Sequence, residues 1–104
     1  MHTQKDVNEI ISRFIELAGK EINIKHIYLF GSYARGTYSE YSDIDVAIVS
    51  DDFQGIPFYD RQRMIKYILK TSDSLELHPF KTDDFNPEIN PFVNEIINTG
   101  IMIL

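Results

Sequence analysis

Asp43 and Asp45 are the residues of this sequence best suited to chemistry, because they place two carboxylates one residue apart. They begin the run DIDVAIVS, residues 43–50, whose branched and apolar residues predict a core strand. Side chains two apart on a strand point to the same face. Two carboxylates at the start of a buried strand repel each other and need a cation, and oxygen ligands suit Mg²⁺. Alternatively, both aspartates lie at a solvated strand end and cap nearby backbone groups.

Glu76 is a third candidate carboxylate. It lies in residues 74–80, SLELHPF, whose alternation predicts a strand that Pro79 ends. If this strand lies beside residues 43–50, Glu76 completes a carboxylate triad, which can hold two metal ions, one on the attacking and one on the leaving oxygen. The other interpretation is an exposed glutamate on an edge strand. His78 shares the face of Glu76 and is expected to be a polar residue near the strand end rather than a catalytic base.

A glycine–serine pair, Gly31 and Ser32, directly follows the apolar residues 24–30, which predict a strand. Glycine lets the backbone bend and approach a ligand closely. The free N–H groups at the start of a helical turn over residues 32–36, together with the Ser32 hydroxyl, would suit a phosphate. By itself, the pair is more typical of a simple turn.

The elements that must position these residues follow from hydrophobic periodicity. Helices and strands alternate along the chain, which predicts an α/β (α+β) fold: a short mixed sheet with helices packed mainly on one face. The strand at 43–50 should be central, because its apolar side chains point to both faces. Helices are predicted at 3–18, 58–70 and 91–99, strands at 24–30, 43–50, 74–80 and 101–104, and one helical turn at 32–36.

Composition narrows the class of protein. A chain of 104 residues is one small domain, and 43% hydrophobic with 25% charged residues is typical of a globular protein. The net charge of −6 argues against a protein that binds nucleic acid directly. The absence of cysteine excludes disulfides and thiolate chemistry. Residues 1–8 hold no signal peptide and no apolar run could cross a membrane, so we expect a cytoplasmic protein without a membrane partner.

The stretch GSYARG at residues 31–36, followed five residues later by SDIDV at residues 42–46, resembles the signature of the DNA polymerase β-like nucleotidyltransferases. Its length makes the chain similar to the minimal nucleotidyltransferases (MNT), which are usually paired with a HEPN-domain protein. The resemblance covers nearly the whole chain and implies a nucleotidyltransferase fold in one domain over residues 1–104. The LELHPF strand resembles the family's third-carboxylate strand, with Glu76 in place of the commoner aspartate.

The resemblance implies a role for each motif residue. Gly31 and Ser32 would hold the triphosphate of ATP. Asp43 and Asp45 would bind two Mg²⁺ ions, and Glu76 would ligate the catalytic ion and help deprotonate the acceptor hydroxyl. The reaction would be in-line attack of that hydroxyl on the α-phosphate, with pyrophosphate leaving.

Two further motif residues, Arg35 and Ser42, are expected to contact the nucleotide. For Arg35 two interpretations stay open. Its guanidinium touches a phosphate, or it pairs with a carboxylate and fixes the loop, and the second is slightly favoured.

The resemblance implies a type VII-like antitoxin that acts as a protein adenylyltransferase. It would transfer AMP from ATP to a hydroxyl group, above all that of a tyrosine, on a HEPN ribonuclease toxin. This modification would neutralise the toxin. Larger relatives carry a helical domain that grips the acceptor, so the acceptor here should bring its own surface. One alternative is a binding-only antitoxin that masks the toxin within a hetero-oligomer. Another is a small-molecule (antibiotic) nucleotidyltransferase. The clustered carboxylates favour the protein-modifying enzyme.

The partner surface is expected to be aromatic as well as acidic. Several aromatic residues lie in or beside the loops that flank the motif, and so small a core cannot bury them all. The alternative is that the two phenylalanines pack under the loop and the tyrosines are ordinary surface. The residues are Tyr33, Tyr38, Tyr41, Phe53, Phe58 and Tyr59.

Overall fold

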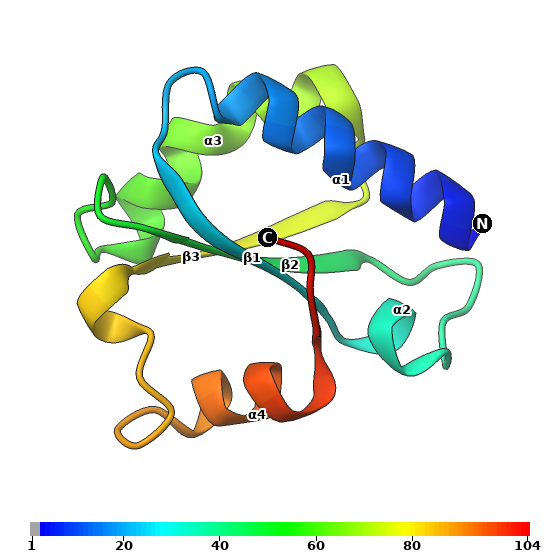
Figure 1. The fold of residues 1–104 in the computed structure, drawn as a ribbon. Helices are drawn as coiled ribbons and strands as arrows, with labels where there is room; N and C mark the ends of the chain where they lie inside the picture. Colours follow the sequence, from blue (N-terminus) through cyan, green and yellow to red (C-terminus); the bar gives the residue numbers. More distant parts are fainter. Residues whose placement is uncertain (1–2) are drawn as a thin grey trace.

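The computed structural model describes residues 3–104, so Met1 and His2, on which part of the signal-peptide expectation depends, lie outside the described residues. A four-stranded mixed sheet in the order β3-β2-β1-β4 carries α1 and α3 on one face and α4 on the other (Figure 1). This confirms the predicted fold class. The elements are α1 (Gln4–Ala18), β1 (Ile24–Phe30), α2 (Ser32–Arg35), β2 (Ile44–Ser50), α3 (Pro57–Thr71), β3 (Leu75–Lys81), the 3₁₀ turn η1 (Thr82–Asp84), α4 (Pro91–Thr99) and β4 (Ile101–Met102).

β2 is an inner strand of the sheet, between β3 and β1. It pairs antiparallel with β1 and parallel with β3, and its residues are buried from Val46 to Ser50. The antiparallel register with β1 sets Phe30 opposite Asp45. The prediction of a central second strand is therefore confirmed, although β2 begins at Ile44, one residue later than expected.

β3 lies at an edge of the sheet, with β2 as its neighbour. The strand runs through Pro79 to Lys81, so the prediction that Pro79 ends it is wrong. Proline has no N–H to offer a ladder, and an edge strand tolerates that loss. As a consequence His78 lies within the strand, opposite Ala47, rather than at its end.

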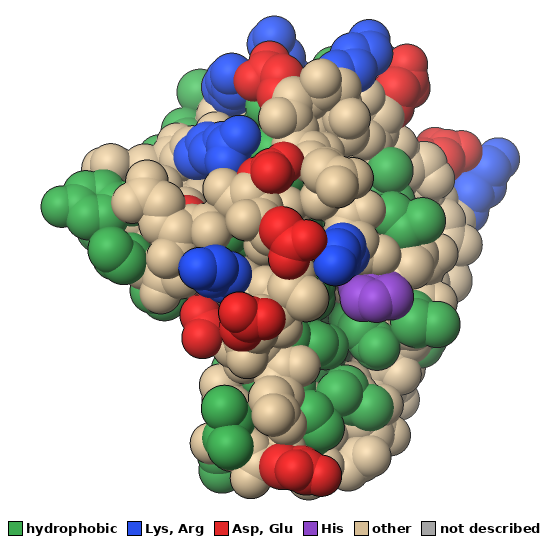
Figure 2. All heavy atoms as spheres, turned by 60° about the vertical axis from the view of Figure 1, so that its left-hand side comes forward, with side chains coloured by type: hydrophobic (Ala, Val, Ile, Leu, Met, Phe, Trp, Pro, Cys, Tyr) green, Lys and Arg blue, Asp and Glu red, His purple; other side chains and the backbone are tan. Residues whose placement is uncertain are grey.

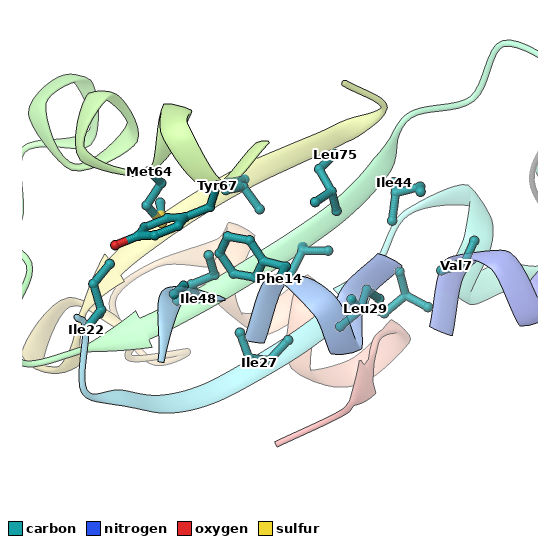
Figure 3. Packing of buried hydrophobic residues seen from close by; sticks show 14 of the residues in the cluster. Val7, Phe14, Ile22, Ile27, Leu29, Ile44, Ile48, Met64, Tyr67 and Leu75 are labelled. Carbon is teal, nitrogen blue, oxygen red and sulfur yellow. The ribbon is translucent and has the colours of Figure 1, made fainter. Parts of the chain in front are cut away.

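The main core lies between the sheet and the two long helices (Figure 3). Thr3 caps the start of α1: its side chain accepts from the Asp6 N–H while the Asp6 carboxylate accepts from the Thr3 N–H, the predicted capping box. Spacing of three and four residues then stacks the apolar side chains of α1 on one face. That face buries Val7, Ile11, Phe14 and Ala18 against the sheet and α3.

α3 begins at Pro57, and a buried carboxylate ties it to the loop that precedes it. Asp60 is only 2% exposed, and its two oxygens accept hydrogen bonds from the N–H groups of Gln54 (2.9 Å) and Gly55 (3.0 Å). Gly55 has a φ of 85°, a region that favours glycine. The loop between β2 and α3 is therefore closed onto the helix.

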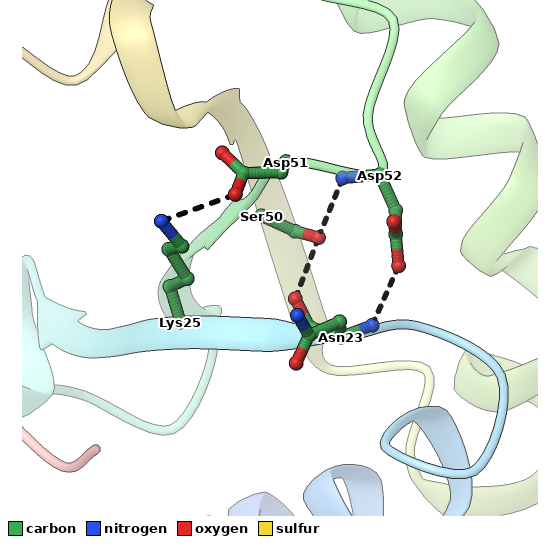
Figure 4. Close-up of polar contacts among 5 residues, drawn as sticks. All are labelled: Asn23, Lys25, Ser50, Asp51 and Asp52. Atoms are coloured by element: carbon green, nitrogen blue, oxygen red, sulfur yellow. Dashed lines mark hydrogen bonds and ion pairs between the residues drawn. The ribbon is translucent and has the colours of Figure 1, made fainter.

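A polar cluster fixes the start of β1 against the end of β2 (Figure 4). The Ser50 hydroxyl donates to the Asn23 carbonyl (2.8 Å) and accepts from the Asp52 N–H (3.0 Å). The Asp52 carboxylate accepts from the Asn23 N–H (2.7 Å), and Lys25 pairs with Asp51 (3.1 Å). These contacts hold the β1–β2 register at the end of the two strands that lies away from Asp45.

Candidate functional site

Asp45, Glu76 and His78 project from one face of the β2–β3 pair. The parallel register sets Asp45 opposite Glu76 and Ala47 opposite His78, so strand alternation places the three side chains together. One donor atom of each lies within 4.8 Å of the others. His78 Nε2 is 3.6 Å from Asp45 Oδ1 and 3.9 Å from Glu76 Oε1. The predicted convergence of Asp45 and Glu76 is thus present, and His78 joins it.

Asp43 lies outside this group. It is exposed and stands one residue before β2, so the expectation of a strand that includes Asp43 is wrong by one residue. Its donor atoms are not among those within 4.8 Å of one another. Its charge nevertheless raises the pKa of Glu76, which shows that Asp43 adds to the negative potential of the site.

The electrostatics of the cluster are those of crowded acids. Burial raises the pKa of the Glu76 carboxyl, and Asp45 raises it further through a hydrogen bond and through its like charge. His78 acts in the opposite direction. The Nε2 atom of His78 is buried and has no hydrogen-bond partner among residues 3–104. Two carboxylates and an unpartnered nitrogen form a donor set that a divalent cation would satisfy.

Gly31 and Ser32 lie against the same acids. Gly31 has φ 74° and ψ −153°, a backbone region that is almost confined to glycine, and precedes the four-residue helix α2. A Cβ on Gly31 would overlap the carboxylate of Asp45. The first N–H groups of α2 have no acceptor within the helix, and no side chain caps them. The turn therefore offers N–H donors within a short distance of Asp45.

The other two predicted nucleotide contacts differ in their surroundings. Arg35 is exposed and forms no ion pair among the described residues, so the favoured pairing with a carboxylate is not seen. The Ser42 hydroxyl accepts from the Ser39 N–H (2.8 Å), and the Ser42 N–H donates to the Ser39 carbonyl (3.2 Å). Ser42 thus closes the loop that leads into β2, while the Arg35 guanidinium is free to meet a ligand.

Aromatic rings surround His78 on the α4 side of the sheet. Its ring meets Phe30 edge to face at 5.0 Å and Phe92 at 5.7 Å. Sequence reasoning missed both phenylalanines, since Phe30 reads as an ordinary strand residue and Phe92 comes from a distant helix. A small pocket of about 160 Å³ continues from here, lined by Pro57, Arg61, His78, Pro79, Phe80 and Phe92.

A larger groove of about 400 Å³ runs between α3 and the free edge of β3. Its walls are mostly apolar, and Glu76 is the one carboxylate among its lining residues. It is lined by Phe58, Arg61, Gln62, Ile65, Ile68, Leu75, Glu76 and Leu77.

The aromatic residues expected on a partner surface divide into two groups. Tyr33 and Phe53 are each 2% exposed, so neither belongs to a surface, and for Phe53 the alternative of burial is confirmed. Tyr38 is half-buried in a stack on Tyr33. Tyr41, Phe58 and Tyr59 are exposed. In Figure 2, charged side chains of both signs mix across the middle of the visible face, and hydrophobic ones gather below, at the height of α4. No helix in residues 3–104 has the length and apolarity to span a membrane.

Comparison with known proteins gives a consistent picture. The family described as polymerase beta, nucleotidyltransferase matches residues 12–104. Two proteins of Methanocaldococcus jannaschii, both named as candidate protein adenylyltransferases, are similar in sequence. One is 34% identical over 70 residues, which cover 67% of this chain and 70% of the relative. The other is 43% identical over 79 residues, which cover 74% and 75%.

Solved structures share the fold at lower sequence identity. A candidate nucleotidyltransferase from Sulfolobus solfataricus matches with a TM-score of 0.64 and 19% identity, over 98% of this chain and 89% of that one. A mutant of the toxin–antitoxin MntA–HpeT matches with a TM-score of 0.62 and 18% identity, over 94% and 72%. A toxin–antitoxin with AMP-PNP matches with a TM-score of 0.59 and 20% identity, over 92% and 71%.

Proposed function

Because the chain belongs to the polymerase beta nucleotidyltransferase family, we propose that it transfers AMP from ATP to a hydroxyl group of a partner protein. The observation that carries the proposal is the approach of Asp45 and Glu76 beside the Gly31–Ser32 turn, which joins the acidic and the phosphate-binding halves of the motif. The similar proteins named as adenylyltransferases support AMP as the transferred group. Residues 1–104 would act as one minimal nucleotidyltransferase domain.

The cluster fits the Mg²⁺ ions that the family implies. Asp45 and Glu76 supply carboxylate oxygens, and Asp43 adds charge nearby. The pKa of Glu76 is raised by burial and then by Asp45, whose repulsion a cation would relieve. When bound, Mg²⁺ supplies neutralisation of phosphate charge and polarises the reacting oxygens. We assign two ions to Asp43, Asp45 and Glu76 together.

Residues of the chain would bind the triphosphate and accept the proton of the acceptor hydroxyl. The N–H groups at Gly31 and Ser32 hold the triphosphate, and Arg35 and Ser42 flank the turn from which the nucleotide is held. The acceptor oxygen attacks the α-phosphorus, its proton passes to the Glu76 carboxylate, and the bond to pyrophosphate breaks. A carboxylate beside the acceptor hydroxyl can act as its general base.

The acceptor would be a HEPN-domain toxin, modified on a tyrosine. Toxin–antitoxin structures among the matches support an assembly with a toxin. The groove between α3 and β3 gives a protein acceptor a route to Glu76, because its apolar walls can bind side chains beside the target hydroxyl. Phe58 and Tyr59, exposed on the first turn of α3, extend this surface.

Labelled nucleotides test the proposal. The chain, Mg²⁺ and the proposed HEPN-domain partner are mixed with ATP labelled at either the α- or the γ-phosphate, and with the other three nucleotides. The proposal expects label on the toxin from α-labelled ATP alone, together with loss of ribonuclease activity. If the toxin's ribonuclease activity is inhibited without nucleotide, and equally by the Asp45→Asn variant, the protein is a binding-only antitoxin and not an enzyme.

A further inference from the structure

The imidazole of His78 is placed neither like a solvated surface side chain nor like a core side chain whose polar atoms are hydrogen-bonded. Its Nε2 atom points toward Asp45 Oδ1 and Glu76 Oε1 at 3.6 and 3.9 Å, beyond the length of a hydrogen bond. That nitrogen is buried without a hydrogen-bond partner among the described residues, and the two carboxylates are its only charged neighbours there. A buried polar atom without a partner is unfavourable, and native structures rarely keep one without a reason.

The spacing of the three donors suits a common ligand. Metal–ligand bonds of about 2.1 Å place neighbouring corners of an octahedron about 3.0 Å apart and opposite corners about 4.2 Å apart. The donor atoms of Asp45, Glu76 and His78 lie within 4.8 Å of one another. A small inward shift of the Asp45 and Glu76 carboxylates toward the fixed imidazole would bring all three donors to one ion.

The surroundings of His78 hold the ring in this orientation. Phe30 and Phe92 contact it edge to face from β1 and α4. The residue opposite on β2 is Ala47, whose small side chain leaves space for the imidazole above the sheet. A ring locked by packing presents its nitrogen without a large loss of rotamer freedom.

We infer that His78 is a direct ligand of the cation bound by Asp45 and Glu76, and that it gives the site a preference for Mn²⁺ over Mg²⁺. This inference rests on the proposed function, since it concerns the cation of the same site. Mg²⁺ favours oxygen ligands and retains several waters, whereas transition-metal ions accept an imidazole nitrogen. Mn²⁺ suits both halves of this set, because it also binds in octahedral oxygen-rich sites.

Manganese itself is the probe. Binding of Mn²⁺ to the intact chain, with and without AMP-PNP, is followed by the loss of the electron paramagnetic resonance signal of the free ion, and Mg²⁺ is titrated as a competitor. Pulsed measurements on bound Mn²⁺ then report a directly coordinated ¹⁴N nucleus. We expect nitrogen coupling in the wild type, absent in His78→Gln, whose Mn²⁺ affinity falls about 10-fold or more while its Mg²⁺ affinity changes about 3-fold or less.

His26→Gln is the matched control, because His26 lies exposed on β1, where its Nδ1 contacts the Leu104 carbonyl (3.3 Å). It should keep both affinities and the nitrogen coupling. Bound Mn²⁺ without nitrogen coupling in the wild type overturns the inference, even if His78→Gln fails to fold, and so does the absence of Mn²⁺ binding. Asp45→Asn separates the two proposals: if it retains cation binding, the proposed site fails. If it abolishes binding while the wild type shows no nitrogen coupling, only the role of His78 fails.

Discussion

The Cα of Gly31 lies so close to Asp45 that a Cβ at position 31 would stand 3.1 Å from the carboxylate carbon and overlap one carboxylate oxygen. The two halves of the motif, separated by a loop in sequence, are therefore in contact in space. Two independent demands meet at Gly31, since its φ of 74° also excludes a side chain. The glycine is needed as much for the acid it faces as for any phosphate.

Gly31→Ala, compared with a second glycine of positive φ, should separate the contact with Asp45 from ordinary backbone strain. The substitution forces the Asp45 carboxylate aside and strains the backbone, so we expect a loss of about 1–3 kcal/mol in unfolding free energy together with loss of cation-dependent AMP transfer. Gly36→Ala is the control, because Gly36 also has a positive φ, 75°, but nothing lies within 4 Å of its would-be Cβ. Urea unfolding and transfer assays compare the two. Equal transfer by both variants would disprove the contact as the reason for the glycine.

Glu76→Gln should change how stability depends on pH in the metal-free protein. The pKa of Glu76 is raised on folding, by burial and by Asp45. A carboxyl with a raised folded pKa destabilises the folded state once it ionises, so the wild type should lose stability as the pH rises from the ordinary value of a glutamate through the raised one. The glutamine does not ionise.

The melting temperatures of wild type and Glu76→Gln in chelator, compared between about pH 4 and pH 7, check this sign. The variant should gain on the wild type as the pH rises, by a small amount because the Glu76 side chain is half-exposed. Adding Mg²⁺ at pH 7 should reverse the order. A wild type that instead gains on the variant in chelator would contradict the assignment of Glu76 as a crowded acid.

Asp60→Ala should destabilise the fold through the loop that precedes α3. It leaves the N–H groups of Gln54 and Gly55 without their acceptor at a buried position. We expect about 2–4 kcal/mol of lost unfolding free energy. Asp83→Ala, at an exposed aspartate of η1, should stay within about 0.5 kcal/mol. Denaturant titrations measure both, and a loss below about 1 kcal/mol for Asp60→Ala would show that solvent replaces its carboxylate.

Ile65→Glu tests the acceptor groove between α3 and β3. Ile65 is part of its lining and is half-exposed, so a charge there should weaken the acceptor without harming the fold. We expect the KM for the protein acceptor to rise about 10-fold or more, with nucleotide affinity unchanged. Leu69→Glu is the control, since Leu69 lies on the same helix, is more exposed and does not line the groove. Equal acceptor KM values for the two variants would show that the groove does not bind the acceptor.

The sequence predicted the elements closely where periodicity and breakers agree. The strand at 24–30 has the expected bounds, and α1 and α3 differ by one residue at their ends. The pairing of Asp45 with Glu76 followed from strand alternation, once the two strands were taken as neighbours. What alternation cannot supply is which strand lies at an edge.

That missing knowledge explains the error at Pro79. Pro79 was expected to end a strand, and only its edge position lets the strand continue and brings His78 inward. The contact between Gly31 and Asp45 depends on an antiparallel register, which tertiary contacts set. Likewise, no local pattern distinguishes Tyr33, which is buried, from Tyr41, which is 88% exposed.

The intact mass of the partner tests the central claim most directly. The proposed HEPN-domain partner is co-expressed with the wild type or with Asp45→Asn, purified and weighed by mass spectrometry. The account predicts the mass of one or more AMP groups on the partner from the wild-type co-expression and none from Asp45→Asn, although both forms still bind it. An unmodified partner with the wild type, or the same added mass with Asp45→Asn, would contradict it.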